Sequence, residues 1–198
     1  SRMHSPFKKE ELEKINIFIL LALEFNKTHN IFSRQGCDEV YEKDILDCEP
    51  LIKRIKDNSS VLDLGSGGGF PGILLAITKP KNKVSLIESS AKKCFFLRSV
   101  KDKLSLGNIT IINKKIEPNN KIGIFDVITA RAFASIDKIT KLTNTNSNKH
   151  TKYLLLKGKN KTTQEELRDI DKNLFLYEII KQDTKPHERI LVVIKKNE

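Results

Sequence analysis

A glycine-rich segment between two acidic residues holds the residue types in this chain that are best suited to binding a cofactor. Gly65 and Gly67 follow Asp63 within a few residues, and Glu88 comes further along the chain. Glycine lets the backbone approach a ligand closely and adopt positive φ angles. An acidic residue after the next strand can hydrogen-bond the ribose of an adenosine-type cofactor. The segment therefore predicts such a cofactor, with the loop backbone against it and Glu88 on its sugar.

Two cofactors fit the spacing. The Gly-x-Gly-x-x-Gly pattern of dinucleotide-binding loops occurs as Gly67-x-Gly69-x-x-Gly72. The acid-x-Gly-x-Gly-x-Gly pattern, which suits S-adenosylmethionine, begins at Asp63 with its first glycine at Gly65. We favour S-adenosylmethionine, because Gly65 directly follows a predicted strand and an acid suits a cofactor with a sulfonium and an ammonium group. A nicotinamide-dependent oxidoreductase stays the alternative, whereas a Walker-type phosphate loop is excluded because no Gly-Lys-Ser/Thr follows.

Short apolar strands that alternate with helices position this loop. We predict strands at 61–64, 84–87, 109–112, 125–129, 153–156, 175–180 and 190–194, and helices at 7–30, 38–55, 71–77, 92–106, 136–142 and 163–170. Five strand–helix repeats predict a mostly parallel sheet with right-handed crossovers, and the last two strands predict an antiparallel hairpin at one edge. Pro50 is expected to break or kink the second helix. The fold class is α/β and Rossmann-like, with N-terminal helices before the sheet.

Composition limits the partners. The 198 residues fit one domain, 1–198, with a helical extension over 1–57 and a cofactor-binding core over 58–198. A net charge of +11 favours polyanions, nucleic acid first. No apolar run is long enough for a membrane span, so we expect no membrane partner. An odd number of cysteines without close spacing predicts no disulfide framework and no metal site, and fits a cytoplasmic protein; they are Cys37, Cys48 and Cys94.

Several motifs spread over nearly the whole chain form a combination that is more specific than any one of them. They are Asn26-Lys27-x-x-Asn30-Ile31, Ile45-Leu46-Asp47, the segment Asp63 to Gly72 with its Phe70-Pro71-Gly72 tail, Glu88-Ser89 with Lys92-Lys93, the segment Phe125 to Ala132, Lys157-Gly158, and Glu188-Arg189 with Leu191 to Lys195. This combination resembles the bacterial 16S ribosomal RNA guanine-N7 methyltransferases, historically called glucose-inhibited division protein B.

The resemblance implies a class I methyltransferase that transfers a methyl group from S-adenosylmethionine to N7 of a guanine, in the loop around guanine 527 of 16S RNA. By position, Gly65 and Phe70 would hold the cofactor, Ile116 and Glu117 would bracket its adenine, and Arg131 would lie beside its methionine end. The partner would be 16S RNA or the small ribosomal subunit, and we expect a monomer. N7 carries a lone pair and no proton, so no general base, and no catalytic residue, is assigned. A class I methyltransferase with another substrate stays possible.

The chain departs from the family pattern at two positions. Asp44 stands where the family usually has a histidine, and Cys48 where it usually has a serine. These departures concern RNA contacts more than the cofactor site, and they are the only support for a non-catalytic RNA-binding protein. Candidate phosphate contacts are Lys92, Lys93, Arg98, Lys114, Lys115, Lys157 and Lys159.

Overall fold

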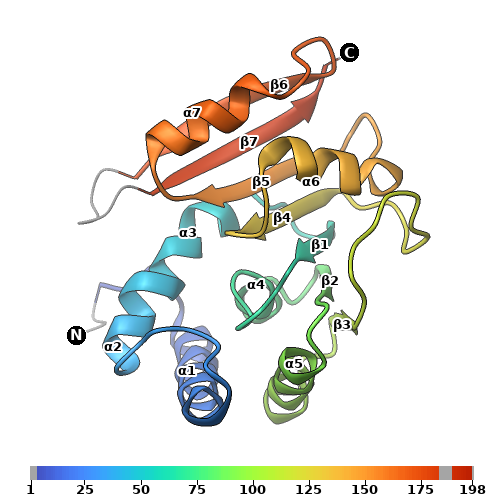
Figure 1. Cartoon of the computed structure of the whole chain (residues 1–198). Helices are drawn as coiled ribbons and strands as arrows, with labels where there is room; N and C mark the ends of the chain where they lie inside the picture. Colours follow the sequence, from blue (N-terminus) through green and yellow to red (C-terminus); the bar gives the residue numbers. More distant parts are fainter. Residues whose placement is uncertain (1–3, 183–188, 198) are drawn as a thin grey trace.

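A seven-stranded sheet forms the centre of the protein in the computed structural model, which describes residues 4–182 and 189–197 (Figure 1). The strands are β1 (Ser60–Leu64), β2 (Lys83–Ile87), β3 (Ile109–Ile112), β4 (Val127–Arg131), β5 (Lys152–Lys157), β6 (Phe175–Lys181) and β7 (Ile190–Lys196). Their order is β3-β2-β1-β4-β5-β7-β6. Strands β1 to β5 pair in parallel, whereas β7 is antiparallel to both β5 and β6. The predicted fold class is confirmed.

Helices cover both faces of the sheet. One face carries α1 (Lys9–His29), α2 (Cys37–Val40), α3 (Leu46–Ile52), α4 (Gly72–Thr78) and α5 (Ala91–Leu104), and the other carries α6 (Ile136–Leu142) and α7 (Asn160–Arg168) (Figure 1). Successive strand residues point to opposite faces. On β1, Val61 therefore joins the core under α1 to α5, whereas Leu62 and Leu64 join the core under α6 and α7.

The N-terminal helices belong to the first of these cores. The Phe18 ring of α1 lies 5.1 Å from the Phe70 ring in the glycine-rich segment and 6.4 Å from the Phe96 ring of α5. Phe18 is fully buried, and aromatic pairs at these separations stabilise beyond the area that they bury. Helix α1 thus packs against the glycine-rich segment through Phe70.

The expected break at Pro50 is absent. The chain runs from α2 through a π-helical turn at Tyr41–Ile45 into α3, which continues past Pro50 to Ile52. The proline removes one hydrogen bond in the last turn of a helix that ends two residues later, so little helix is lost.

The connection between β3 and β4 also differs from the expected strand–helix repeat. Residues 113–126, all of them described, contain no helix, and β4 begins at Val127 rather than at 125. Phe125 instead donates its backbone N–H to the Asn146 carbonyl at 2.9 Å, and the Asp126 carboxylate accepts from the Ser60 N–H at 2.9 Å. This irregular segment carries Ile116 and Glu117.

The three cysteines carry free thiols, with Cys48 and Cys94 buried and Cys37 half-buried. In the part of the chain that the structure describes, no group of three or more His, Cys, Asp or Glu residues is placed to hold a metal ion. Of the helices within residues 4–182 and 189–197, none combines the length and the apolar character needed to cross a bilayer.

Candidate cofactor site

A cavity of about 590 Å³ opens beside the glycine loop, past the carboxyl ends of β1, β2 and β4. Its walls are Gly65, Ile87, Glu88, Ser89, Lys93, Lys114, Lys115, Ile116, Glu117, Pro118, Ala132, Phe133, Ala134, Lys138 and Leu142. Ligands of open α/β sheets bind at this edge, where the strand order reverses, here between β1 and β4. The volume lies within the range of small-molecule pockets, about 300–1,000 Å³.

The eight predicted site residues divide into two groups. Gly65, Glu88, Ile116 and Glu117 line the cavity. The other four, Asp63, Gly67, Phe70 and Arg131, are not among its walls. They surround the same loop, so the structure brings all eight into one neighbourhood without placing all of them against one ligand.

The loop owes its shape to glycines. Gly65, Gly67 and Gly69 have φ angles of +62°, +53° and +96°, in the left-handed region that favours glycine. The Gly65 N–H donates to the Ile87 carbonyl at 2.9 Å, which ties the loop to the end of β2. A Cβ atom at Gly65 would overlap the ring of Phe133. Gly65 therefore presents bare backbone to the cavity.

Glu88 is held by the backbone on both sides. Its Oε1 accepts from the Gly67 N–H at 2.9 Å, and its Oε2 accepts from the Ser90 N–H at 2.8 Å. The side chain lines the cavity although the residue is only 7% exposed. Each carboxylate oxygen has a second lone pair, so both can still accept from a hydroxyl group. Glu88 therefore keeps the hydrogen-bonding capacity that the predicted contact with a ribose requires.

Asp63 lies beneath the loop. It is fully buried, its Oδ2 accepts from the Gly72 N–H at 3.0 Å, and its Oδ1 accepts from the Thr129 hydroxyl at 3.0 Å. Burial raises the pKa of Asp63 to about 7, against the hydrogen bonds that favour the carboxylate. A Cβ at Gly72 would lie 2.6 Å from Oδ2, so glycine is needed there. Asp63 thus joins β1, β4 and the start of α4.

Arg131 and Phe70 lie against each other on the side of the loop toward the N-terminal helices. The Arg131 guanidinium lies 5.1 Å from the Phe70 ring centroid, a cation–π distance. Its Nη2 donates to Asp44 Oδ1 at 2.7 Å, and its Nη1 lies 3.5 Å from Asp47 Oδ2. Phe70 is 6% exposed. The charged end of Arg131 is therefore engaged with the segment that precedes the sheet.

Two fully buried carboxylates and three arginines form what we call the arginine–aspartate cluster, which consists of Arg34, Asp44, Asp47, Arg131 and Arg189. Arg34 donates to both oxygens of Asp44 at 2.9 and 3.0 Å, and Arg189 donates to both oxygens of Asp47 at 2.7 and 2.6 Å. Such two-point pairs are the stronger form of arginine–carboxylate contact. The cluster joins the N-terminal segment to β4 and β7.

Of the two departures from the family pattern, Asp44 is a member of this cluster and Cys48 contacts it. Asp44 contacts two arginines, and the Cys48 thiol donates to the Asp44 carbonyl at 3.2 Å. Cys48 is fully buried, and this burial raises the pKa of its thiol. Asp44 and Cys48 both have hydrogen-bond partners within the protein, and neither lines the cavity. The spacing of these residues in the sequence gave no sign of the cluster, because its members come from four separate segments.

Comparison with known proteins settles the family. The family model described as rRNA small subunit methyltransferase G matches residues 11–190. The chain belongs to this family. A relative from Brachyspira hyodysenteriae, Ribosomal RNA small subunit methyltransferase G, is 37% identical over 184 residues, which cover 92% of this chain and 89% of that protein. Membership confirms the resemblance, the predicted enzyme class and the predicted cofactor, S-adenosylmethionine.

Solved structures agree on the fold. Precorrin-6y C5,15-methyltransferase from Geobacter metallireducens has a TM-score of 0.59 at 15% identity, over 83% of this chain and 93% of that chain. Coclaurine N-methyltransferase bound to N-methylheliamine and SAH has a TM-score of 0.54 at 17% identity, over 78% and 53%. At these identities the similarity shows the fold alone. The nicotinamide-dependent alternative receives no support from the family.

The cavity of this family member fits S-adenosylmethionine. Ile87 and Ile116 offer apolar walls for an adenine, Glu88 offers acceptors for a ribose, and Gly65 leaves the backbone open to close approach. Lys93, Lys114, Lys115 and Lys138 line the cavity as well. Of the predicted phosphate contacts, three therefore reach the cavity. Lys157 does not, because its Nζ pairs with Glu166 at 2.9 Å and donates to the Ala134 carbonyl at 2.7 Å.

Phe133 is a residue of the cavity wall that sequence reasoning missed. Ala132, directly after β4, has φ +50°, a conformation that costs a non-glycine residue about 1–2 kcal/mol. This turn places the Phe133 ring against Gly65 in the cavity wall. Strained residues concentrate at functional sites. The recognised motif stopped at Ala132, and no sequence pattern indicates a left-handed alanine.

Proposed function

We propose that the protein methylates N7 of a guanine in 16S ribosomal RNA, in the loop around guanine 527, using S-adenosylmethionine. The observation that carries the proposal is the cavity at the strand-order reversal, in which Gly65, Glu88, Ile116 and Glu117 converge in a member of this family. We also propose that it acts in the cytoplasm, where it would meet the ribosome. The expected monomeric state stays a prediction.

The eight predicted residues would share the work in two ways. Gly65, Glu88, Ile116 and Glu117 would contact the cofactor, since they line the cavity. Asp63, Gly67, Phe70 and Arg131 would act through the loop: Asp63 from beneath, Gly67 through its bond to Glu88, and Phe70 with Arg131 from the side of the N-terminal helices. This division follows from which atoms are already engaged within the protein.

The chemistry asks for alignment rather than proton transfer. S-adenosylmethionine, when bound, supplies an electrophilic methyl group. The guanine N7 lone pair would form the new bond to the methyl carbon as the carbon–sulfur bond breaks, and the positive charge would pass to the guanine ring. No histidine is among the cavity walls, and none is needed. Holding two reactants in line is worth up to about 7–11 kcal/mol in favourable systems.

The RNA must present the guanine outside a helix. N7 lies in the deep, narrow major groove of paired RNA, which side chains cannot enter. A loop base or an extruded base meets the requirement. Lys93, Lys114, Lys115 and Lys138 would contact the flanking phosphates, because they line the cavity. Phe133, beside them in the wall, offers an apolar surface to the base.

Methyl transfer to defined RNA tests the proposal. The protein is incubated with methyl-labelled S-adenosylmethionine and either unmodified 16S RNA or unmodified small subunits, and the RNA is mapped by mass before and after. We expect one added methyl group on a guanine N7 in the stated loop. Label in another nucleotide or in protein would refute the substrate. Binding of S-adenosylhomocysteine without transfer to either RNA form would support the non-catalytic alternative instead.

A further inference from the structure

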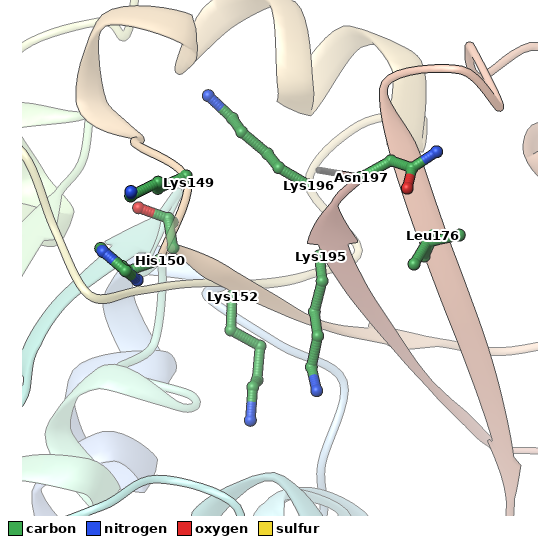
Figure 2. A pocket seen from close by; sticks show the side chains of 8 residues that line it. Lys149, His150, Lys152, Leu176, Lys195, Lys196 and Asn197 are labelled. Carbon is green, nitrogen blue, oxygen red and sulfur yellow. The ribbon is translucent and has the colours of Figure 1, made fainter.

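A basic hollow lies beside the start of β5 and the end of β7 (Figure 2). It has a volume of about 550 Å³ and is lined by Lys149, His150, Thr151, Lys152, Leu176, Lys195, Lys196 and Asn197. Because β5 begins at Lys152 and is parallel to β4, the hollow lies where the parallel strands begin. The cavity lies where those strands end, so the two openings are on opposite edges. We call this site the lysine hollow.

Strand register concentrates charge in the lysine hollow. In the antiparallel ladder of β5 and β7, Lys152 lies directly opposite Lys195. Figure 2 shows both side chains extending from neighbouring strands in the same direction. Like charges directly opposite each other in a ladder are destabilising. The fold therefore tolerates an unfavourable pair at this position.

The surroundings do not neutralise this charge. Partial burial lowers the pKa of Lys152, and Lys195, Lys56 and Arg54 lower it further, whereas Glu178 opposes the shift. Within the described residues, none of the four lysines has a carboxylate oxygen within 4.0 Å of its amino group; the four are Lys149, Lys152, Lys195 and Lys196. An anion entering the hollow would relieve the repulsion among them.

The chemistry of the lining favours RNA phosphates as the occupant. Lysine acts as a point charge on a flexible stem, which suits phosphate contacts that carry no base information. Leu176, 56% exposed, adds one apolar wall on which a ribose can rest. The net charge of +11 gives the whole chain an attraction for polyanions. A 16S RNA is large enough to reach both edges of a protein of this size.

We propose that the lysine hollow binds backbone phosphates of the ribosomal RNA at a distance from the methylated guanine, so that the substrate contacts both edges of the sheet. This inference rests on the proposed function, which supplies the RNA. It implies that a short RNA loop and a long RNA differ in how much of the protein they touch. The lysine hollow would then increase the affinity for RNA and fix the position of the RNA on the protein, without taking part in methyl transfer.

Salt dependence of RNA binding tests the hollow directly. The test variant combines Lys149→Gln, Lys152→Gln and Lys195→Gln. The control combines Lys9→Gln, Lys14→Gln and Lys103→Gln, which remove the same charge from exposed positions on α1 and α5. The dissociation constant of unmodified 16S RNA is measured from low to high salt. We expect the log–log slope of the test variant to fall by about 2 to 3, since each phosphate contact contributes about 0.7–0.9. Equal slopes in the test and control variants would overturn the proposal.

Two further measurements separate this inference from the proposed function. If the wild-type protein methylates no RNA, the proposed function is refuted. The salt dependence of RNA binding in the test and control variants would still show whether the lysine hollow binds RNA. If both hold, the test variant should methylate a short hairpin at the wild-type rate and full-length 16S RNA more slowly at low RNA concentration. Its affinity for S-adenosylhomocysteine should match the control. Loss of binding to phosphatidylglycerol vesicles with an unchanged RNA slope would assign the hollow to a membrane surface and overturn the RNA proposal.

Discussion

The two sides of the glycine loop differ in how they satisfy their polar groups. On the cavity side, Glu88 is held by two backbone amides and keeps lone pairs for a ligand. On the opposite side, Asp44 and Asp47 are fully buried and engaged by three guanidinium groups. The carboxylate on the cavity side therefore keeps acceptor capacity for a ligand, whereas the carboxylates on the opposite side are paired with arginines of the protein. A polar group with spare hydrogen-bonding capacity at a cavity wall is a better indicator of ligand contact than charge or sequence position.

The largest effect on cofactor affinity is expected on the cavity side, from Gly65→Val. The new side chain would overlap the Phe133 ring and occupy a φ of +62° that a β-branched residue disfavours. We expect S-adenosylhomocysteine affinity, measured by calorimetric titration, to fall by more than about 100-fold, which corresponds to about 2.7 kcal/mol. Gly68→Ala is the matched control, because its Cβ would meet nothing closer than 3.5 Å. Near-normal affinity in Gly65→Val would remove the loop from the cofactor site.

A substitution in the arginine–aspartate cluster should lower the free energy of unfolding rather than the affinity for the cofactor. Asp44→Asn leaves the guanidinium groups of Arg34 and Arg131 with an uncharged partner in a buried place. Breaking a buried ion pair costs about 3–5 kcal/mol. We expect a loss of that order in urea unfolding, and S-adenosylhomocysteine affinity within about threefold of wild type for the folded fraction, less than 1 kcal/mol.

The control for that prediction is Asp137→Asn, which breaks an i,i+4 pair with the exposed Lys141 and should leave the unfolding free energy nearly unchanged. A large fall in cofactor affinity with unchanged stability in Asp44→Asn would contradict the division between the two sides. It would restore Arg131 to direct contact with the methionine end of the cofactor.

Asp63 lies between the two sides and should make the free energy of unfolding depend on pH. Burial raises the pKa of its carboxyl group from the ordinary value of 3.8 to about 7 in the folded protein. A carboxyl group with a raised pKa binds its proton more tightly when folded, so its contribution is fully present below pH 4 and is lost as pH rises through about 7. Asp63→Asn keeps a hydrogen-bonding group of the same shape and should remove this dependence. We expect the unfolding free energy of wild type to fall by about 4 kcal/mol relative to the variant between pH 4 and 7.5, at about 1.4 kcal/mol per pKa unit. Parallel pH profiles of the two proteins would contradict the buried, protonatable state of Asp63.

Local patterns predicted much of this molecule. The strand–glycine–helix pattern at Val61 to Gly72 located the loop, because positive φ angles and a close approach restrict those positions to glycine. The alternation of apolar segments gave the sheet and its terminal hairpin. Both signals arise from residues that are close in sequence and obey simple periodicity, so they need no knowledge of the partner segments.

Features built from distant segments could not be predicted in this way. Asp44 appeared as an unexplained departure from the family. Its partners Arg34 and Arg131 become visible only once the segment before α2, the π-helical turn and β4 are packed together. The same holds for the lysine hollow, where Lys152 and Lys195 meet through strand register. The irregular connection from β3 to β4 lacks the period of either a helix or a strand. Tertiary packing decides each of these.

The smallest effect is expected from Ala132→Gly, which tests whether the cavity side stores strain. Glycine adopts the observed φ of +50° without the steric cost that alanine bears, although it also adds entropy to the unfolded chain. We expect urea unfolding to show a gain of at most about 1 kcal/mol. Methyl transfer to 16S RNA should slow by a few-fold, because the turn would fix the Phe133 ring against Gly65 less firmly. Ala134→Gly, in the same wall but without a positive φ, is the control. A loss of stability in Ala132→Gly as large as in Ala134→Gly would show that the left-handed alanine is not strained, and that Phe133 owes its position to packing alone.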